Sequence, residues 1–497
     1  MGQRQTGAIA AGHALSAAAA AEILEDGGNA FDAVIAALAA ACVCEPVLAS
    51  PAGGGFLMAR DGAGGTTRLI DFFLHTPARK QPPEQLEFYR VDVDFGPARQ
   101  AFHIGHGAAA VPGLVPGLLD IHARFAVLPL ARLLEPAIRC ARDGIAVTAF
   151  QAFLGAVVEP ILTATEDARA VFAPGGRLIA EGEQLTNPQL GEFFAGLGAE
   201  GEPFYRSVMD RHVTGDAAGR GHLQTGDIAA YQVVHRQPLA IARRGAEILL
   251  NPPPSSGGAM IARAFHELGE AAGPGAYADA LARADAARRR AAGDPDRLLA
   301  DIGMSTGAEL PGGTVSRGTT HVSIIDGAGN AASATVSNGE GNGHMVSGLG
   351  FMMNNVLGEE DLNPRGFHQW RPGRRLSSMM APALVEFKDG ALAAVGSGGS
   401  NRIRSAMFQA IARLTGGEMP DQVVAAPRVH VEGRHLDFED LFGDQVRQTL
   451  TGRFADHRAW PERNLFFGGV HCARRDAGGV FSGAGDGRRG GGYLAVT

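Results

Sequence analysis

The residues best suited to chemistry stand where a glycine-rich segment meets a strand-like one. Residues 303–318 (GMSTGAELPGGTVSRG) hold five glycines and a proline and show no apolar periodicity, which is typical of a mobile loop. An ordinary surface linker would have the same composition. The sequence then continues GTTHVSII from Gly318, so two threonines and a histidine open an apolar, strand-like run.

Two strand-like runs after this loop form a predicted hairpin. They span 320–325 and 331–337, and the turn sequence DGAGN joins them. A hairpin that is symmetric about Ala328 places Thr319 opposite Ser337, whereas a slip of one residue would turn Ser337 to the other face of the sheet. Two hydroxyl groups would then lie side by side at the start of a strand.

A threonine at such a start can act as a nucleophile if the Gly318–Thr319 peptide bond is cut. Its hydroxyl is a poor nucleophile until a base removes the proton. The cut frees the α-amine of Thr319, and a pKa of about 7.7–8.0 leaves that amine partly neutral near pH 7 and able to act as the general base. Ser337 would orient the hydroxyl. The pattern therefore predicts amide cleavage through an acyl-threonine ester.

Two later segments are candidates for binding the oxyanion of this reaction. Ser377 and Ser378 in LSSM offer paired hydroxyls, and GSGGSNR offers the backbone N–H groups of Gly399 and Ser400. Each segment taken alone would also suit an ordinary turn between strands.

Helices and strands alternate around these residues. We expect a helix over 14–26 that ends at Gly27–Gly28, and a second, more buried helix that Asn29 caps and that runs to about Cys44. Further elements are predicted as strands at 56–59, 67–73, 248–250 and 493–496, and as helices at 259–268 and 276–297.

Composition limits the class of protein. The 497 residues are 45% hydrophobic and 19% charged, which indicates a globular chain with a sizeable core. The net charge is −8 and no long basic run occurs, so nucleic acid is not an expected partner. The alanine-rich run at 33–44 is too short to span a membrane and no leader pattern precedes it, so we expect a cytoplasmic protein. The four cysteines, at 42, 44, 140 and 472, match no zinc spacing and are expected to be reduced.

Seven stretches in order resemble the γ-glutamyltransferase family of N-terminal-nucleophile hydrolases: EILEDGGNAFDAVIAA, PAGGGF, NPPPSSGG, GTTHVSIIDGAGNA, MMNN, RRLSSMMAP and GSGGSNRI. The resemblance implies an α+β fold, the four-layer αββα sandwich. It also implies a precursor that cuts itself before Thr319 into a large subunit (1–318) and a small subunit (319–497) that share one structural domain. It implies neither a metal nor an organic cofactor.

The resemblance also implies roles for individual residues. Thr319 matches the nucleophile and base, and Ser337 falls where the family usually has an orienting threonine. The remaining matches are Ser377 and Ser378 with the serines that hold the substrate α-carboxylate, and Gly399 and Ser400 with the Gly-Gly pair of the oxyanion hole.

Four positions depart from the family pattern. Phe73 stands in place of the arginine that binds the substrate α-carboxylate, which removes a bidentate cationic partner. Gly339 replaces an asparagine, although Asn338 is adjacent, and Val356 replaces a glutamine. Glu359 replaces the aspartate that binds the substrate α-amino group. The amide-cleaving residues are thus matched more fully than the glutamyl-binding ones.

Three interpretations of these departures are open. A cation from another direction could replace the lost arginine; the candidates are His75, Arg374, Arg375 and Arg402. Glu359, Glu360 and Asp361 could instead recognise an amine while Phe73 recognises an apolar group. All the changes could also be packing changes with an unaltered substrate.

The sequence therefore predicts an autoprocessed amidase whose substrate is a small amide or peptide. A γ-glutamyl group, as in glutathione or γ-glutamyl peptides, is the first expectation, with hydrolysis or transfer to an amine as the outcome. The alternatives are an amidase or acylase for a non-glutamyl substrate, and an uncleaved, non-enzymatic binding protein. Nucleotide binding through GDGRRGGG is disfavoured because the run lacks the Lys-Ser/Thr of a P-loop. The expected protein partner is the other subunit, and a homodimer is left open.

Overall fold

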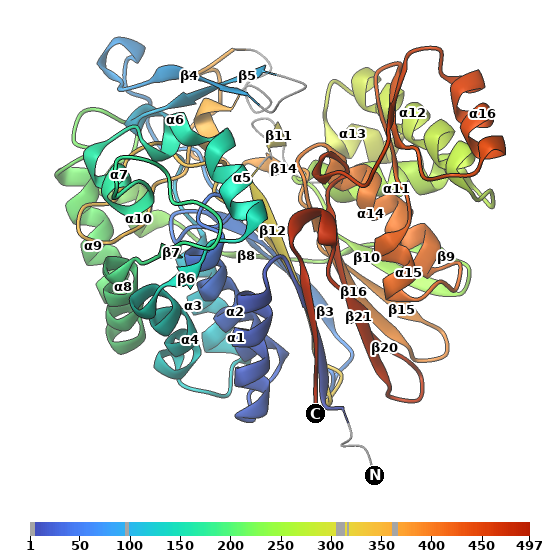
Figure 1. The fold of residues 1–497 in the computed structure, drawn as a ribbon, viewed down its shortest axis with the longest axis horizontal. Helices are drawn as coiled ribbons and strands as arrows, with labels where there is room; N and C mark the ends of the chain where they lie inside the picture. The colour runs from blue at the N-terminus through green and yellow to red at the C-terminus, as the bar shows by residue number, and fades with distance from the viewer. Residues whose placement is uncertain (1–4, 95–98, 305–313, 316–317, 360–365) are drawn as a thin grey trace.

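Two facing β-sheets form the centre of the molecule, with helices on both outer sides (Figure 1). The computed structural model describes residues 5–94, 99–304, 314–315, 318–359 and 366–497. Within these residues the larger sheet has seven strands, in the order β22 (Gly492–Val496), β1 (Gly7–Ala11), β12 (Thr319–Asp326), β13 (Ala331–Ser337), β2 (Gly54–Arg60), β3 (Thr67–Phe72) and β8 (Val234–Arg236).

The smaller sheet packs face to face against the larger one. Its six described strands run in the order β21 (Phe481–Ala484), β20 (Gly469–Arg475), β16 (Leu392–Gly398), β15 (Ala383–Phe387), β10 (Ala246–Leu250) and β9 (Leu239–Arg243). Each sheet combines strands from before and after residue 318, so both parts of the chain share one core.

One helical layer covers the outer face of the larger sheet. It is built on α1 (Ala14–Glu25), α2 (Ala30–Cys44), α3 (Leu114–Phe125), α4 (Leu130–Asp143), α8 (Pro188–Glu200) and α9 (Glu202–Thr214). Three shorter helices lie above it: α5 (Ala149–Val157), α6 (Glu159–Leu162) and α7 (Glu166–Phe172), with α10 (Thr225–Ala230) beside α9.

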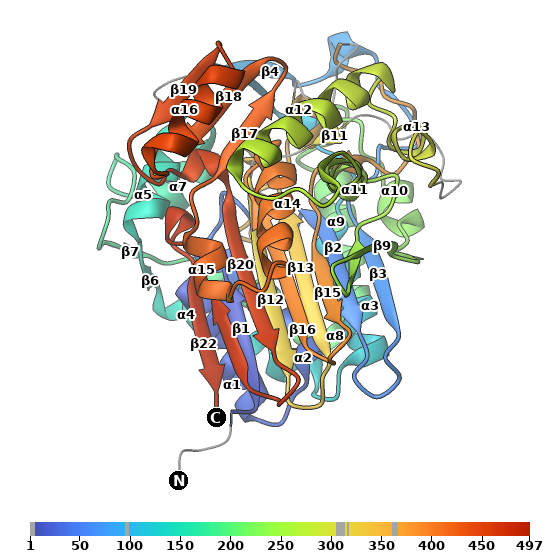
Figure 2. The ribbon, with the colours of Figure 1, turned by 90° about the vertical axis from the view of Figure 1, so that its right-hand side faces the viewer.

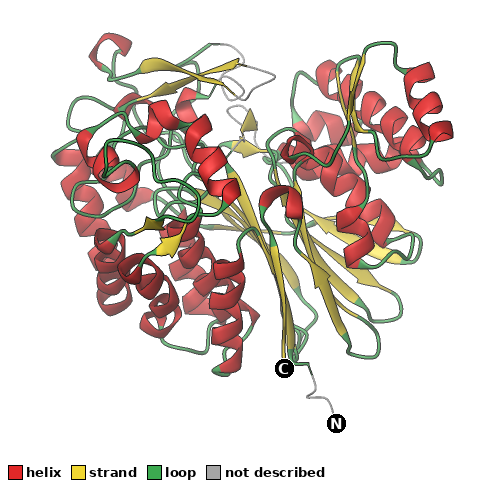
Figure 3. Ribbon diagram, viewed as in Figure 1, coloured by secondary structure: helices red, strands yellow, loops and turns green. Residues whose placement is uncertain are grey.

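The other helical layer lies on the smaller sheet. It comprises α11 (Ser256–Leu268), α12 (Pro274–Arg290), α13 (Pro295–Ala300), α14 (Arg402–Leu414), α15 (Pro420–Ala425) and α16 (Asp444–Arg453), and Figure 2 shows α11, α12 and α14 in front of this sheet. The layers alternate helix, strand, strand, helix in Figure 3. The chain therefore has the four-layer αββα arrangement, an α+β fold.

Short ribbons complete the described chain. They pair β4 (Tyr89–Asp94) with β5 (Arg99–Ile104), β6 (Ile145–Ala146) with β7 (Gln184–Leu185), β11 (Thr314–Val315) with β14 (Ser377–Ser378), and β17 (Val429–Glu432) with β18 (His435–Glu439) and β19 (His457–Trp460). No helix among the described residues is long and apolar enough to cross a bilayer.

Local sequence signals explain the first two helices. Asn29 accepts hydrogen bonds from the N–H groups of Phe31 and Asp32, and the Asp32 carboxylate accepts one from the Asn29 N–H, so a full capping box starts α2. Every residue of α2 is buried, because its alanines allow close packing against the sheet and α1. Both helices are confirmed near the expected bounds.

The other elements differ from expectation mainly at their ends. Helix α11 starts three residues before the predicted 259, and the predicted helix at 276–297 divides into α12 and α13. All four cysteines are free, as expected. Of the predicted loop at 303–318, residues 305–313 and 316–317 lie outside the described residues, whereas Thr314–Val315 form a parallel strand pair with Ser377–Ser378.

Candidate active site

The hairpin register places two hydroxyl residues opposite each other, as the sequence predicts. Thr319 pairs with Ser337 at the start of the β12–β13 ladder, and both residues are buried. The Ser337 hydroxyl donates a 2.7 Å hydrogen bond to the Gly318 carbonyl oxygen. The Gly339 N–H donates to the Ser337 oxygen at 3.2 Å, which directs the serine proton toward Gly318. Ser337 thus contacts the carbonyl of the peptide bond expected to be cut.

The end of strand β16 packs directly on Thr319. A Cβ atom on Gly398 would lie 2.3 Å from the Thr319 carbonyl oxygen, so only glycine permits this approach. Gly399 follows at φ +125° and Ser400 at φ +58°. The φ of Ser400 is in the left-handed region, which costs a non-glycine residue about 1–2 kcal/mol. The second residue of the pair therefore keeps a glycine-like backbone despite its side chain.

The Gly399–Ser400 turn presents backbone N–H groups at the start of α14. Among the described residues, neither the Gly399 N–H nor the Ser400 N–H donates a hydrogen bond. Backbone donors at the N-terminal end of a helix attract negative charge, because the helix dipole is positive there. The turn has the chemistry of an oxyanion site.

Ser377 and Ser378 lie on β14 beside the start of helix α11. The Ser377 hydroxyl is 2.9 Å from that of Ser256, and the Ser378 hydroxyl accepts from the Met380 N–H at 3.0 Å. The backbone of Thr314–Val315 pairs alongside these two serines. In the intact chain, the backbone of Thr314 and Val315 therefore lies alongside the two serines expected to hold a substrate.

A buried amide group lies beside Ser337. The Asn338 side chain is fully buried, and neither its Oδ1 nor its Nδ2 has a hydrogen-bond partner among the described residues. A Cβ on Gly339 would lie 2.0 Å from Asn355 Oδ1 and 2.8 Å from Glu359 Oε1. Buried polar atoms are rarely left unpaired, so the Asn338 amide has the capacity to bind a water molecule or a ligand.

Phe73 is part of the core between the two sheets. It is fully buried and stacks on Phe56, with ring centroids 5.4 Å apart. Its carbonyl oxygen accepts from the Tyr231 hydroxyl at 2.7 Å and from the Arg375 guanidinium. Phe73 therefore has a packing role. Val356 is also fully buried in this core.

Two of the four candidate replacements for the lost arginine, Arg375 and Arg402, have other partners. The Arg375 guanidinium is buried and contacts the Phe73 and Gln232 carbonyl oxygens, the Tyr231 hydroxyl and, at 3.4 Å, the Asp71 carboxylate. Arg402 donates to the Phe466 carbonyl at 3.1 Å, and its guanidinium lies 4.7 Å from the Phe466 ring centre.

The remaining candidates are no better suited to an anion. Burial and the nearby Arg375 charge lower the pKa of His75 to about 3, so its imidazole is neutral at physiological pH. Arg374 is exposed. Glu360 and Asp361 lie outside the described residues.

Two charged residues near the junction escaped the sequence reasoning. The Thr320 hydroxyl lies 3.0 Å from both oxygens of Glu45, and burial raises the pKa of Glu45 to about 7. Arg489 is buried too, and its Nη1 would lie 3.5 Å from a Cβ on Gly398. Glu45 could have been found from the sequence, because it is a single acidic residue at the end of an apolar helix. Arg489 could not, because the GDGRRGGG run that contains it predicts only a glycine-rich turn and not a position near Thr319.

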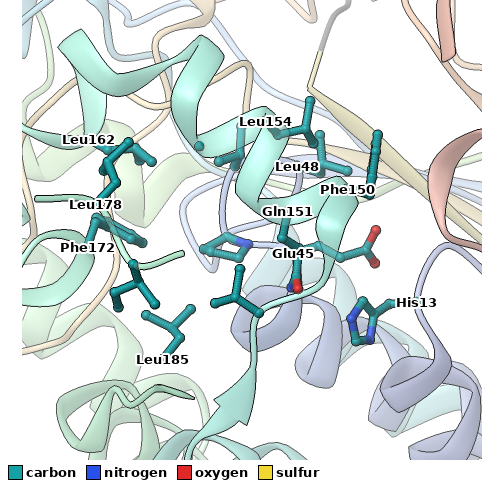
Figure 4. Close-up of a pocket in the computed structure, with 15 residues that line it drawn as sticks. His13, Glu45, Leu48, Phe150, Gln151, Leu154, Leu162, Phe172, Leu178 and Leu185 are labelled. Atoms are coloured by element: carbon teal, nitrogen blue, oxygen red, sulfur yellow. The ribbon is translucent and has the colours of Figure 1, made fainter. Parts of the chain in front are cut away.

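An apolar cavity of about 60 Å³ lies beside the junction. Leucine and phenylalanine side chains from α5, α6 and α7 line it, with Glu45 and His13 at one side (Figure 4). Val47 and Leu48 also line it, and the Val47 carbonyl oxygen would lie 2.8 Å from a Cβ on Gly318. One of the residues that line the cavity, Val47, thus lies against Gly318.

The four-layer fold, with a buried threonine opening a central strand, is that of the N-terminal-nucleophile hydrolases. The family model described as Gamma-glutamyltranspeptidase matches residues 16–496. The Acylase ACY 1 proenzyme of a Pseudomonas species is 33% identical, over 90% of this chain and 86% of its own length. The Glutathione hydrolase proenzyme of Pseudomonas aeruginosa is 30% identical, over 85% of this chain and 82% of its own.

Solved structures agree on the fold. The cephalosporin acylase of Bacillus halodurans superposes with a TM-score of 0.82 at 23% identity, covering 99% of this chain and 96% of its own. The chain belongs to the gamma-glutamyltranspeptidase family and is an enzyme of the N-terminal-nucleophile class.

Proposed function

We propose that this chain cuts its own Gly318–Thr319 bond and then acts as an N-terminal-threonine amidase. The hydrogen bond from Ser337 to the Gly318 carbonyl oxygen carries this proposal, because it polarises the bond that must break. The proenzyme names of the acylase and glutathione hydrolase relatives support a processing step.

Self-cleavage would proceed through an ester. The Thr319 hydroxyl oxygen attacks the Gly318 carbonyl carbon, the C–N bond breaks, and the nitrogen takes up the proton that the hydroxyl loses. Gly318 is then esterified to Thr319. Water hydrolyses this ester to a Gly318 carboxylate and leaves Thr319 with a free amine and a free hydroxyl. Ser337 donates to the carbonyl oxygen while negative charge develops there.

Cleavage of a substrate amide would follow the same steps, with the Thr319 hydroxyl attacking the carbonyl carbon of a separate molecule. The free amine of Thr319 removes the proton from its own hydroxyl, which attacks the substrate carbonyl, and then passes that proton to the leaving amine. The N–H groups of Gly399 and Ser400 bind the oxyanion. Water resolves the acyl-Thr319 ester by hydrolysis, and an amine acceptor would resolve it by transfer.

For the acyl group, we favour an apolar, non-glutamyl substituent. A glutamyl α-carboxylate would need a cation, and the buried guanidinium of Arg375 is already bonded to protein oxygens. The cavity beside Val47 and Leu48 is instead lined mostly by apolar side chains. Departure of Gly318 would join this cavity to the space at Thr319.

A γ-glutamyl group is the second candidate, and Asn338 is the observation that favours it. Its buried amide has no hydrogen-bond partner among the described residues and offers polar groups for an amino acid head, and the adjacent Gly339 lies against the Glu359 carboxylate. The Pseudomonas aeruginosa relative is named a glutathione hydrolase.

Anilides of hexanoate, phenylacetate, acetate and γ-glutamate separate the two candidates. We expect the highest kcat/KM for the apolar acyl groups. Leu154 lines the cavity, so Leu154→Trp should lower kcat/KM for hexanoyl anilide roughly tenfold relative to acetyl anilide. Phe153→Trp, at an exposed position of the same helix, is the matched control. A preference for γ-glutamyl anilide that Leu154→Trp leaves unchanged would contradict the apolar assignment.

A cytoplasmic location stays a prediction.

A further inference from the structure

Three potential metal ligands converge outside the proposed catalytic residues. Glu87 lies just after the 3-10 turn η1 (Pro83–Gln85), His106 begins the turn η2 (His106–Ala108), and His344 lies between β13 and the turn η3 (Val356–Gly358). One ligand atom from each of the three lies within 4.8 Å of the other two. His106 is 3% exposed, and Glu87 and His344 are partly buried.

The distances fit atoms that face a common point. His344 Nε2 lies 3.0 Å from one Glu87 oxygen, and His106 Nε2 lies 3.7 Å from the other. A tetrahedral zinc site with ligand distances of about 2.0–2.1 Å has ligand atoms about 3.3 Å apart. The imidazole rings of His106 and His344 have centroids only 4.1 Å apart.

These close contacts are not hydrogen bonds. Neither His106 Nε2 nor His344 Nε2 has a hydrogen-bond partner among the described residues, although both nitrogens are buried. The 3.0 Å contact between His344 and Glu87 brings the two ligand atoms close without the alignment of a hydrogen bond. Apart from these contacts to Glu87, the two buried nitrogens have no polar partner among the described residues, and a shared ion would satisfy both.

We propose that Glu87, His106 and His344 bind a Zn²⁺ ion. Two imidazoles and a carboxylate are a donor set that zinc uses with water in the fourth position, whereas Mg²⁺ prefers oxygen donors. Arg220 donates to Glu87 Oε2 at 3.4 Å, which leaves Oε1 for the ion and helps to fix the carboxylate.

The position of this site places the ion between two parts of the chain. Glu87 and His106 belong to residues 1–318 and His344 belongs to residues 319–497, so the ion would join the two proposed subunits. Backbone bonds already connect these loops, because the Gly105 N–H donates to the Asn342 carbonyl oxygen at 2.8 Å. His344 lies on the segment that connects Asn338 with Asn355, so the ion would also help to hold these two side chains in position.

Titration of chelator-treated, full-length protein with ZnCl₂ tests the proposal. We expect one equivalent to bind in calorimetry, elemental analysis to find it after gel filtration, and the melting temperature to rise, with no rise from Mg²⁺. His344→Gln should weaken Zn²⁺ binding at least tenfold. His435→Gln removes a histidine that lies 2.8 Å from Asp456 in an exposed pair and should change nothing.

Three results would overturn the zinc site: no stoichiometric binding by the wild type, unchanged binding by His344→Gln, or an equal loss in His435→Gln. Glu87→Gln provides the same test if His344→Gln fails to fold. The proposal that the ion joins two subunits rests on the proposed cleavage, so the titration is repeated on the uncleaved variant Thr319→Ala. Zinc binding by this variant would support the metal site independently of whether the wild type cleaves itself.

Discussion

Replacing Ser337 with alanine tests the proposed cleavage step by removing one hydrogen bond. Ser337 donates to the Gly318 carbonyl oxygen at 2.7 Å and is held in place by the Gly339 N–H. Loss of a donor to a developing oxyanion typically slows a reaction about 100- to 1000-fold, or about 3–4 kcal/mol. We therefore expect Ser337→Ala to accumulate as full-length protein and to cleave with a half-life at least about 100 times longer.

Pulse-labelled cell-free synthesis followed by denaturing gels measures this rate for the wild type and the variant. Ser337→Thr keeps a hydroxyl at the same place and should cleave much faster than Ser337→Ala. The lost hydrogen bond also costs about 1–3 kcal/mol of stability, so thermal unfolding is measured in parallel to show that Ser337→Ala is folded. Cleavage of folded Ser337→Ala at the wild-type rate would refute the role given to this hydroxyl.

Four further substitutions test other parts of the account. Thr319→Ala should stay uncleaved and inactive on every anilide, and normal processing on a gel would remove Thr319 as the nucleophile. The raised pKa of about 7 at Glu45 means that its folded form holds its proton more tightly than the unfolded chain does. As pH rises from about 4.5 to above 7, the wild type should therefore lose up to about 3 kcal/mol of unfolding free energy relative to Glu45→Gln. Parallel pH curves for the two proteins would contradict this. Ser400→Gly should raise the unfolding free energy by about 1 kcal/mol, because it relieves a left-handed φ of +58°; a loss of stability in denaturant titration would show that the serine is needed. Phe73→Arg should destabilise the protein by several kcal/mol and give no γ-glutamyl activity, since the charge would be buried against Phe56; a folded, γ-glutamyl-active variant would show that Phe73 faces the substrate.

Local signals in the sequence were enough for the elements that carry the nucleophile. The DGAGN turn and the two alternating runs fix the register of β12 and β13, so the Thr319–Ser337 pair could be predicted from a symmetric hairpin. The same holds for Asn29, whose capping box involves residues only two and three positions away. Interactions between residues this close in the sequence can be predicted from the local residue pattern.

The parts that sequence reasoning missed depend on contacts between distant segments. Arg375 reaches Phe73 across 302 positions, and Thr320 reaches Glu45 across 275. Contacts between residues so far apart in the chain produce no periodic pattern in the sequence from which they could be predicted. The pairing of Thr314–Val315 with β14 was missed for the same reason, because the glycine-rich composition around it predicts only a loop.

Mass spectrometry of the purified, denatured wild-type protein tests whether the Gly318–Thr319 bond is cut. We expect a chain that covers residues 319–497 and begins with an unmodified N-terminal threonine, alongside a separate chain that ends at Gly318. A single uncut chain after prolonged incubation, or a cut at any bond other than Gly318–Thr319, would contradict this expectation.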